Sequence, residues 1–257
     1  MTSQYPDEFV AGIEWMWGEG FLSPGGADEV RVLLEGADLT GCRVLDVGSG
    51  LGAIDILLAA EYGAREVLGL EVEAPLVARA EQAVARAGLS DRVRFQLVSP
   101  GPFPVDDGSF DVVFSKDSMI HIPDKPTPYA DVLRVLKPGG LFVASDWLYG
   151  GGAAFSEAMA AWLEVVHLDF KMATPEDSAA ALRRAGFVDV CVRDRNRWYL
   201  GEVEREIDCV SGVNFERAVA ALGRETAEHR LKSSTLKKRV VEQGELRPCH
   251  LRGRKLG

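Results

Sequence analysis

The sequence predicts an α/β fold in which a mostly parallel, seven-stranded sheet is flanked by helices. Short apolar runs alternate with segments of helical periodicity, and glycine or proline separates many of them, which is the pattern of repeated βαβ units. The runs that we expect to form strands are Arg43 to Val47, Glu66 to Leu70, Val93 to Leu97, Phe110 to Ser115, Leu141 to Asp146, Phe187 to Val192 and Glu245 to Arg254.

Helices are predicted between these runs. The segment Ala74 to Ala87 carries Pro75 in its first turn and stops at Gly88, which are common residues at the two ends of a helix. Thr174-Pro175-Glu176-Asp177 is an N-terminal capping pattern. The helical segments that we expect begin at about Ala53 and otherwise comprise Ala74 to Ala87, Tyr129 to Leu136, Phe155 to Phe170, Pro175 to Gly186 and Glu202 to Lys238.

The composition is that of an ordinary globular protein of 257 residues, with 47% hydrophobic and 26% charged residues. The segment Met1 to Phe9 lacks the pattern of a secretory signal, and no apolar run is long enough to span a bilayer. The four cysteines lie far apart without a CxxC pair, which favours free thiols over a disulfide framework or a metal site. These features predict a cytoplasmic protein with no membrane contact and no metal.

The charge is uneven along the chain. A net charge of −10 argues against a general nucleic-acid binder, because affinity for phosphates comes mostly from lysine and arginine. The segment Leu222 to Gly257 is nevertheless locally basic. A solvated helix face followed by a strand is the favoured interpretation, and binding of an anion, either a substrate phosphate or RNA, is the alternative.

A glycine-rich loop follows the first predicted strand. Three alternate glycines in Asp46-Val47-Gly48-Ser49-Gly50-Leu51-Gly52 let the backbone turn tightly and approach a ligand. Glu71, after the second strand, suits the two hydroxyls of a ribose. The spacing is G-x-G-x-G rather than the G-x-G-x-x-G that places a pyrophosphate at a helix N-terminus. The loop therefore favours a cofactor without phosphates, and S-adenosyl-L-methionine is the candidate.

Aromatic residues cluster ahead of this loop, between Tyr5 and Gly26. Helical spacing favours a core role for Phe9, Trp15 and Trp17. Tyr5 precedes the predicted helix, beside Pro6, and its hydroxyl is a candidate for a lid over the cofactor.

Four stretches together carry a more specific pattern. They are Gln4-Tyr5-Pro6-Asp7-Glu8, Trp17-Gly18-Glu19-Gly20-Phe21-Leu22-Ser23-Pro24-Gly25-Gly26, the glycine loop from Asp46 to Gly52, and Phe114-Ser115-Lys116-Asp117-Ser118-Met119-Ile120-His121-Ile122. Over most of its length the chain resembles the Rossmann-like class I S-adenosylmethionine-dependent methyltransferases, and more narrowly the phosphoethanolamine N-methyltransferase family. The N-terminal motif combined with the last stretch is more specific than the glycine loop alone.

The resemblance implies a set of site residues. Tyr5 and His121 would form the family's closing pair above the methyl group, and Asp117 would face the substrate. These three are the predicted catalytic residues. The residues implied to bind the cofactor are Tyr5, Leu22, Ser23, Asp46, Gly48, Gly50, Glu71, Val72, Ser99, Pro100, Ser115, Lys116 and His121. Among them Ser99 stands where the family usually has the aspartate that accepts from the adenine amino group.

The implied substrate residues differ from the family pattern. The family holds a phosphate with tyrosine hydroxyls and basic side chains, whereas the matching positions here are Ile13, Trp147, Phe170 and, less surely aligned, Leu168. A buried phosphate without donors would cost several kcal/mol in lost hydrogen bonds. We therefore expect a more apolar or aromatic substrate pocket, lined by Ile13, Asp117, Trp147 and Phe170.

The chain is expected to be a single domain over residues 1–257. The resemblance implies N-terminal lid helices over 1–40, the cofactor-binding core over 41–147, a helical lid or substrate insertion after strand five over 148–186, and the C-terminal strands and helices over 187–257. Gly150-Gly151-Gly152 is a candidate hinge at the start of the insertion.

The predicted reaction is methyl transfer from S-adenosylmethionine to a small-molecule acceptor, most simply an amine nitrogen. A protonated amine must lose its proton before it attacks, and an imidazole titrates near neutral pH, so His121 is the candidate base. The alternatives are O- or C-methylation of a natural-product-type substrate, methylation of RNA or protein, and a cofactor-binding protein that does not methylate. A monomer or homodimer acting on a small molecule, without nucleic acid, is expected.

Overall fold

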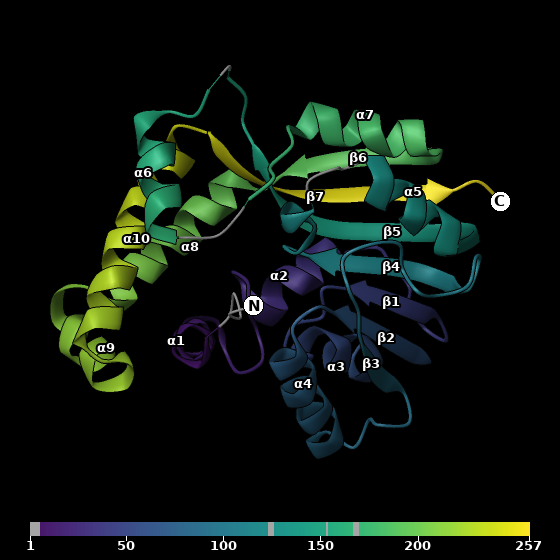
Figure 1. Cartoon of the computed structure of the whole chain (residues 1–257), viewed down its shortest axis with the longest axis horizontal. Coiled ribbons are helices and arrows are strands. Elements are labelled where there is room, and N and C mark those ends of the chain that lie inside the picture. Colours follow the sequence, from purple (N-terminus) through teal and green to yellow (C-terminus); the bar gives the residue numbers. More distant parts are fainter. Residues whose placement is uncertain (1–5, 123–125, 153, 167–169) are drawn as a thin grey trace.

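The computed structural model describes residues 6–122, 126–152, 154–166 and 170–257, and within these ranges seven strands form one sheet in the order β3-β2-β1-β4-β5-β7-β6 (Figure 1). Neighbouring strands are parallel except that β7 runs antiparallel to both β5 and β6. This arrangement confirms the predicted fold. The strands are β1 (Arg43–Val47), β2 (Glu66–Glu71), β3 (Val93–Leu97), β4 (Phe110–Lys116), β5 (Leu136–Tyr149), β6 (Phe187–Asp194) and β7 (Leu246–Lys255).

Helices cover both faces of the sheet because alternate strand residues point to opposite sides. Val44 packs with α2 (Gly26–Leu33), α3 (Ala53–Ala60) and α4 (Ala74–Arg86) in one apolar cluster. Its neighbour Leu45 packs with α5 (Pro126–Val135) and α7 (Pro175–Ala185) in another. The result is a three-layer α/β/α core.

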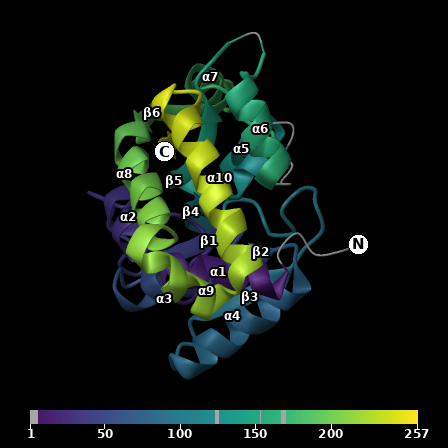
Figure 2. The same ribbon diagram turned by 90° about the vertical axis from the view of Figure 1, so that its left-hand side faces the viewer.

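A further group of helices lies beyond the carboxyl ends of the parallel strands. In Figure 1 the arrows of β4 and β5 point left towards this group, and Figure 2 shows it in front of the sheet. Its apolar core joins Trp162, Tyr199 and Val240. The group comprises α6 (Glu157–Val166), α8 (Asn196–Cys209), α9 (Phe215–Leu222) and α10 (Arg224–Glu242), with α1 (Asp7–Trp17) beside it and short 3₁₀ turns at η1 (Met119–His121) and η2 (Gly212–Asn214).

The long helix predicted over Glu202 to Lys238 is wrong as a single element, because the structure divides it into α8, α9 and α10. The breaks fall at Gly212 and Gly223, whose φ angles of +53° and +81° lie in a region that glycine adopts without strain. Of the helix predicted over Phe155 to Phe170, α6 forms Glu157–Val166, and residues 167–169 lie outside the described ranges.

Strand β5 is longer than predicted at both ends. It begins at Leu136, and its last residues pair with β7, so that Trp147 lies opposite Pro248. Trp147 is therefore part of the strand rather than the residue after it. In the part of the chain that the structure describes, no helix is long and apolar enough to cross a membrane.

A buried ion network joins α2 to the antiparallel edge of the sheet. Glu29 is 2% exposed and accepts two hydrogen bonds from Arg195, at 2.8 and 2.7 Å, and one from His250 Nε2 at 2.7 Å. Burial on its own raises the pKa of Glu29, but the hydrogen bonds from His250 and Arg195 outweigh it and lower the pKa below its ordinary value. Because three segments converge on one carboxylate, this contact fixes α2 against β7.

Replacing Glu29 with glutamine is expected to lower the free energy of unfolding at neutral pH by about 3 kcal/mol, because the buried Arg195 guanidinium loses its counter-ion. A carboxylate with a lowered folded-state pKa contributes stability above its ordinary pKa of 4.5, and this contribution is lost as the pH falls through the folded-state value. Urea denaturation of both proteins should therefore show a gap at neutral pH that closes under acid conditions. A gap independent of pH would contradict this role for Glu29.

Candidate active site

Two adjoining cavities lie at the carboxyl edge of the parallel strands. The larger, about 750 Å³, lies over the glycine loop and the end of β2, and the smaller, about 430 Å³, lies between the sheet edge and α1, α6 and α10. Both cavities are lined by the same four residues at their junction, which are Leu22, Ser23, Asp117 and His121. A ligand in one cavity therefore meets a ligand in the other at these side chains.

The glycine loop forms the floor of the larger cavity. Gly48 and Gly50 have φ angles of +81° and +58°. A Cβ on Gly48 would lie 2.3 Å from the Ser118 side chain, which itself donates a hydrogen bond to the Val47 carbonyl. Glycine is thus required at position 48 both for its backbone conformation and for the close approach of Ser118.

Glu71 lies at the end of β2 and is held by backbone donors. Its Oε2 accepts from Gly50 N at 2.9 Å, and its Oε1 accepts from Val72 N and Glu73 N at 2.7 and 3.0 Å. The carboxylate is therefore oriented by the loop while its side chain still lines the cavity. The predicted cofactor residues that line this cavity are Leu22, Ser23, Gly48, Gly50, Glu71, Val72, Ser99, Pro100, Lys116 and His121.

Two predicted cofactor residues lie behind the cavity wall instead. Asp46 is 1% exposed, and its pKa is raised well above its ordinary value by burial and by the neighbouring carboxyls of Asp55 and Glu71. Ser115 is fully buried and donates to the Val47 carbonyl at 2.9 Å. Ser115 thus holds the backbone where the glycine loop begins, whereas Asp46 lies beside Asp55 of α3 behind the loop.

Lys116 joins the N-terminal segment to the end of β4. Its buried ammonium group donates to Ser23 Oγ at 2.7 Å, to the Pro24 carbonyl at 3.0 Å and to Asp117 Oδ2 at 2.9 Å. Asp117 also accepts from Ser145 Oγ at 2.8 Å, and its φ angle of +56° is unusual for a residue other than glycine. Such local strain is common at functional sites, where surrounding contacts maintain it.

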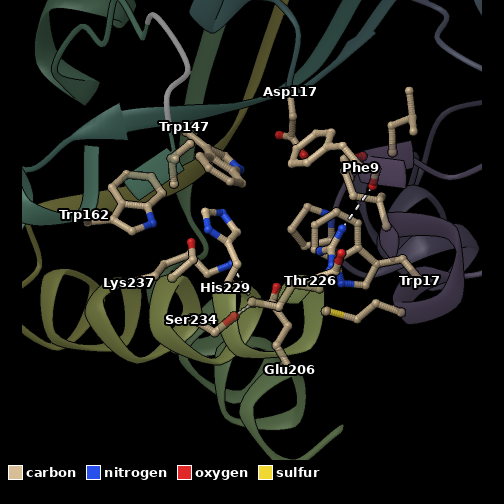
Figure 3. Close-up of a pocket in the computed structure, with 18 of the residues that line it drawn as sticks. Phe9, Trp17, Asp117, Trp147, Trp162, Glu206, Thr226, His229, Ser234 and Lys237 are labelled. Atoms are coloured by element: carbon tan, nitrogen blue, oxygen red, sulfur yellow. Dashed lines mark hydrogen bonds and ion pairs between the residues drawn. The ribbon is translucent and has the colours of Figure 1, made fainter. Parts of the chain in front are cut away.

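The smaller cavity is lined by the predicted substrate residues Ile13, Asp117, Trp147 and Phe170. The Trp147 ring lies 5.6 Å from the Phe170 ring and 6.0 Å from the Trp162 ring, between ring centroids. His121 contacts the same cluster, 5.6 Å from Phe170. Figure 3 shows Trp147 and Trp162 on one flank of the cavity and Phe9 and Trp17 on the other. The expected aromatic character is present in this part of the wall.

The wall of the smaller cavity that α10 and α8 form is polar, and the sequence analysis did not predict a polar wall there. Helix α10 presents Thr226, His229, Arg230, Ser234 and Lys237, and α8 adds Glu206 (Figure 3). The basic character of Leu222 to Gly257, for which anion binding was the alternative interpretation, and the recurrence of polar residues every three or four positions were the available signals, but neither indicated which face of the segment is covered. The expectation of a wholly apolar or aromatic pocket is therefore incomplete.

The N-terminal aromatics have divided roles. Trp15 packs in a cluster with Val210 and Phe215, as its helical spacing predicted. Phe9 and Trp17 line the smaller cavity instead. The predicted lid residue Tyr5, together with His167 and Leu168, lies outside the described residues.

Fold and site together define a class of protein. A mostly parallel sheet with a glycine loop after β1 and a carboxylate at the end of β2, both facing one cavity, is the arrangement of a Rossmann-like nucleoside-cofactor protein. The chain belongs to a methyltransferase family, since residues 38–196 match the family model described as "Methyltransferase domain". The resemblance to class I methyltransferases drawn from the sequence is confirmed.

Individual relatives agree with this assignment. The chain is 32% identical over 206 residues to phosphoethanolamine N-methyltransferase 1 of Triticum aestivum, and the match covers 79% of this chain and 40% of the relative. It is 34% identical over 159 residues to a botryococcene C-methyltransferase of Botryococcus braunii, and that match covers 58% of this chain and 42% of the relative. It thus spans about two fifths of the length of these curated relatives. Among solved structures, phosphoethanolamine N-methyltransferase 2 of Haemonchus contortus, in complex with phosphomonomethylethanolamine and S-adenosylhomocysteine, has a TM-score of 0.90 at 24% identity, covering 99% of this chain and 58% of that one.

Replacing Gly48 with alanine is expected to destabilise the protein more than replacing Gly36 with alanine. Both residues have positive φ angles, so both substitutions carry a backbone cost of about 1 kcal/mol, but a Cβ on Gly36 meets no atom within 4 Å. Only Gly48→Ala forces Ser118 to move, which adds about 2 kcal/mol. Urea denaturation measures both differences, and equal losses would show that the close approach of Ser118 is unimportant.

Proposed function

We propose that this protein transfers a methyl group from S-adenosylmethionine to a small-molecule acceptor, and that the acceptor atom is an amine nitrogen. The observation that carries the proposal is the junction of the two cavities at Asp117 and His121. Membership of the methyltransferase family and the likeness to phosphoethanolamine N-methyltransferases support it. The larger cavity is assigned to the cofactor and the smaller to the acceptor.

The charges of the larger cavity favour a cofactor without phosphates. Its two lining cations are already paired, since Lys116 bonds to Asp117, and Arg134 bonds to Asp107 and Asp131 at 2.6 Å. A diphosphate carries a larger negative charge and would favour free cations in this wall. A nucleoside that carries a positive sulfonium suits a wall in which Glu71 is the acidic group nearest the glycine loop.

In this proposal Glu71 accepts hydrogen bonds from the ribose hydroxyls, and Gly48 and Gly50 let the backbone approach the ligand. Ser99 and Pro100 border the adenine, and Leu22 and Ser23 border the methionine part. S-adenosylmethionine, when bound, supplies an electrophilic methyl group on sulfur. The chain contributes alignment of the acceptor with that methyl group and exclusion of water, which together can supply much of the acceleration.

His121 is proposed as the base and Asp117 as the group that holds the acceptor. An alkyl amine is mostly protonated at neutral pH, so its proton must pass to a base before the nitrogen attacks. Asp117 lines both cavities, and Lys116 and Ser145 each take one of its oxygens, so its carboxylate is fixed in orientation. Tyr5 completes the proposed closing pair with His121.

The remaining expectations belong to the same proposal. We infer one domain over residues 1–257. Of the predicted insertion 148–186, α6 and Phe170 line the proposed acceptor side, whereas α7 packs on the sheet. The cysteines are free thiols in the structure, which supports a cytoplasmic location. A monomer or homodimer without nucleic acid or membrane partners is proposed.

Methylation of carbon is the second candidate. The stacked aromatic wall, in which the Trp162 and Phe170 rings lie 5.8 Å apart, and the relative that bears the name botryococcene C-methyltransferase favour it. A neutral carbon acceptor has no ammonium group for Asp117 to hold, so the atom that carries the transferred methyl group in the product separates the two candidates.

Two measurements test the proposed function. Calorimetry with S-adenosylmethionine and S-adenosylhomocysteine should show micromolar binding, and absence of binding would remove the proposal. Mass spectrometry of a metabolite extract treated with methyl-labelled cofactor should then show label on an amine. Label on carbon would support the second candidate, and binding without any label transfer would support a protein that does not methylate.

Two substitutions should separate the proposed roles. His121→Ala is expected to lower kcat by about 100-fold or more while S-adenosylhomocysteine affinity changes little, because proton removal is lost. Glu71→Ala is expected to weaken S-adenosylhomocysteine binding by about 10-fold or more, because a charged acceptor is lost, with a smaller effect on kcat at saturating cofactor. Glu71→Gln, which keeps the shape of the side chain, is the control. Steady-state kinetics and calorimetry measure the effects, and similar profiles for both alanine variants would refute the division of roles.

A further inference from the structure

We propose that the Arg230 guanidinium binds an anionic group of the methyl acceptor and so determines which amines the protein accepts. The inference rests on the proposed function and names the acceptor class, an amine that also carries a carboxylate or a phosphate. Arg230 comes from α10 and lines the smaller cavity; Figure 3 shows the α10 residues Thr226 and His229 across this cavity from Asp117.

Arg230 is held against α1 by packing rather than by a carboxylate. Its guanidinium lies over the Phe9 ring, 5.7 Å from the centroid, and one terminal nitrogen donates to the Phe9 carbonyl at 3.0 Å. A Cβ on Gly12 would lie 2.4 Å from that same nitrogen. The absence of a side chain at position 12 therefore provides the space in which the guanidinium lies.

The charges around Arg230 leave its own charge uncompensated. Glu206 is 2% exposed, forms an ion pair with Lys237 at 2.5 Å and accepts a hydrogen bond from Ser234 Oγ at 2.9 Å. Asp117 accepts hydrogen bonds from Lys116 and Ser145. Among the described residues no carboxylate lies within ion-pair distance of Arg230, and the other acidic lining residues, Glu8 and Glu225, are exposed to solvent.

Burial lowers the pKa of Arg230, and the charge of Glu206 only partly offsets this effect. A guanidinium remains charged in proteins even so, and a partly buried charge without a partner is costly. A bound anion would remove that cost.

Three polar atoms of cavity residues lack a hydrogen-bond partner among the described residues, although each is enclosed. They are Arg230 Nε, Trp162 Nε1 and Glu206 Oε1. Buried polar groups are normally satisfied, so unpaired polar atoms concentrated just behind the wall of one cavity make its surroundings polar, which favours a polar ligand over an apolar one.

A guanidinium matches the geometry of a carboxylate or phosphate because two parallel N–H groups can bond two oxygens at once. Arg230 donates from one terminal nitrogen to the Phe9 carbonyl, and no hydrogen bond among the described residues involves its other terminal nitrogen. On the other side of the cavity, Asp117 suits the positive nitrogen of the same molecule. Arg230 therefore binds the anionic group of a zwitterionic amine, and Asp117 binds its ammonium group.

The test uses the full chain saturated with S-adenosylhomocysteine and measures binding of three amines by calorimetry: phosphoethanolamine, β-alanine and n-propylamine, which lacks an anion. We expect at least one anionic amine to bind about 10-fold or more tightly than propylamine. Phosphoethanolamine and β-alanine distinguish a phosphate from a carboxylate. Arg230→Met should abolish the preference, and Arg230→Lys should retain part of it.

Arg239→Met is the matched control, because Arg239 lies on the same helix, is exposed and does not line the cavity. Gly12→Ala is a second test variant that keeps the charge but displaces the guanidinium, and alanine favours a helix more than glycine does. It should weaken the anionic amines while leaving propylamine and S-adenosylhomocysteine unchanged.

The outcomes separate this inference from the proposed function. Binding of S-adenosylhomocysteine without any preference for the anionic amines overturns the role of Arg230 and leaves the cofactor assignment intact. Equal losses for all three amines in Arg230→Met and Gly12→Ala would show that Arg230 only stabilises α1, which also overturns it. Failure to bind S-adenosylhomocysteine at all would instead remove the proposed function.

Discussion

The buried ammonium group of Lys116 is the contact on which the shape of the site depends. It donates hydrogen bonds to Ser23 Oγ and the Pro24 carbonyl of the N-terminal segment and to the Asp117 carboxylate at the end of β4. A buried lysine is stable only when its donors are satisfied, so these groups must stay together. Because Ser23 and Asp117 line both cavities, the same contact lies at the junction of the larger and the smaller cavity.

Several residues near this contact adopt backbone conformations with positive φ angles. Glycine at positions 48 and 50 allows the loop to turn at positive φ, and Asp117 adopts a positive φ without being glycine. The carboxyls of Asp46 and Asp55 lie fully buried behind the loop, where burial raises their pKa values. The core of the site is thus built from strand ends and the loops that directly follow them.

The two cavities differ in charge. In the larger cavity the lining cations are paired, which suits a ligand without phosphates. The smaller cavity contains the Arg230 guanidinium, which pairs with no carboxylate of the described residues. The predicted substrate positions Ile13, Trp147 and Phe170 are apolar or aromatic. The structure shows cationic side chains in the same cavity, but they come from α10, about 60 residues or more beyond the last of those positions in the sequence.

The sequence by itself determined the sheet, the glycine loop, the acidic end of β2 and the region of Asp117 and His121, because each depends on residues close together in the chain and on two simple periodicities. It also indicated the methyltransferase family. Only the tertiary structure decided that Asp46 and Ser115 lie behind the cavity wall, that Phe9 and Trp17 line the acceptor side while Trp15 is core, and that one face of the basic C-terminal segment is enclosed. Whether a helix face meets solvent or a cavity depends on contacts between segments more than 200 residues apart, such as Arg230 with Phe9, which no local pattern encodes.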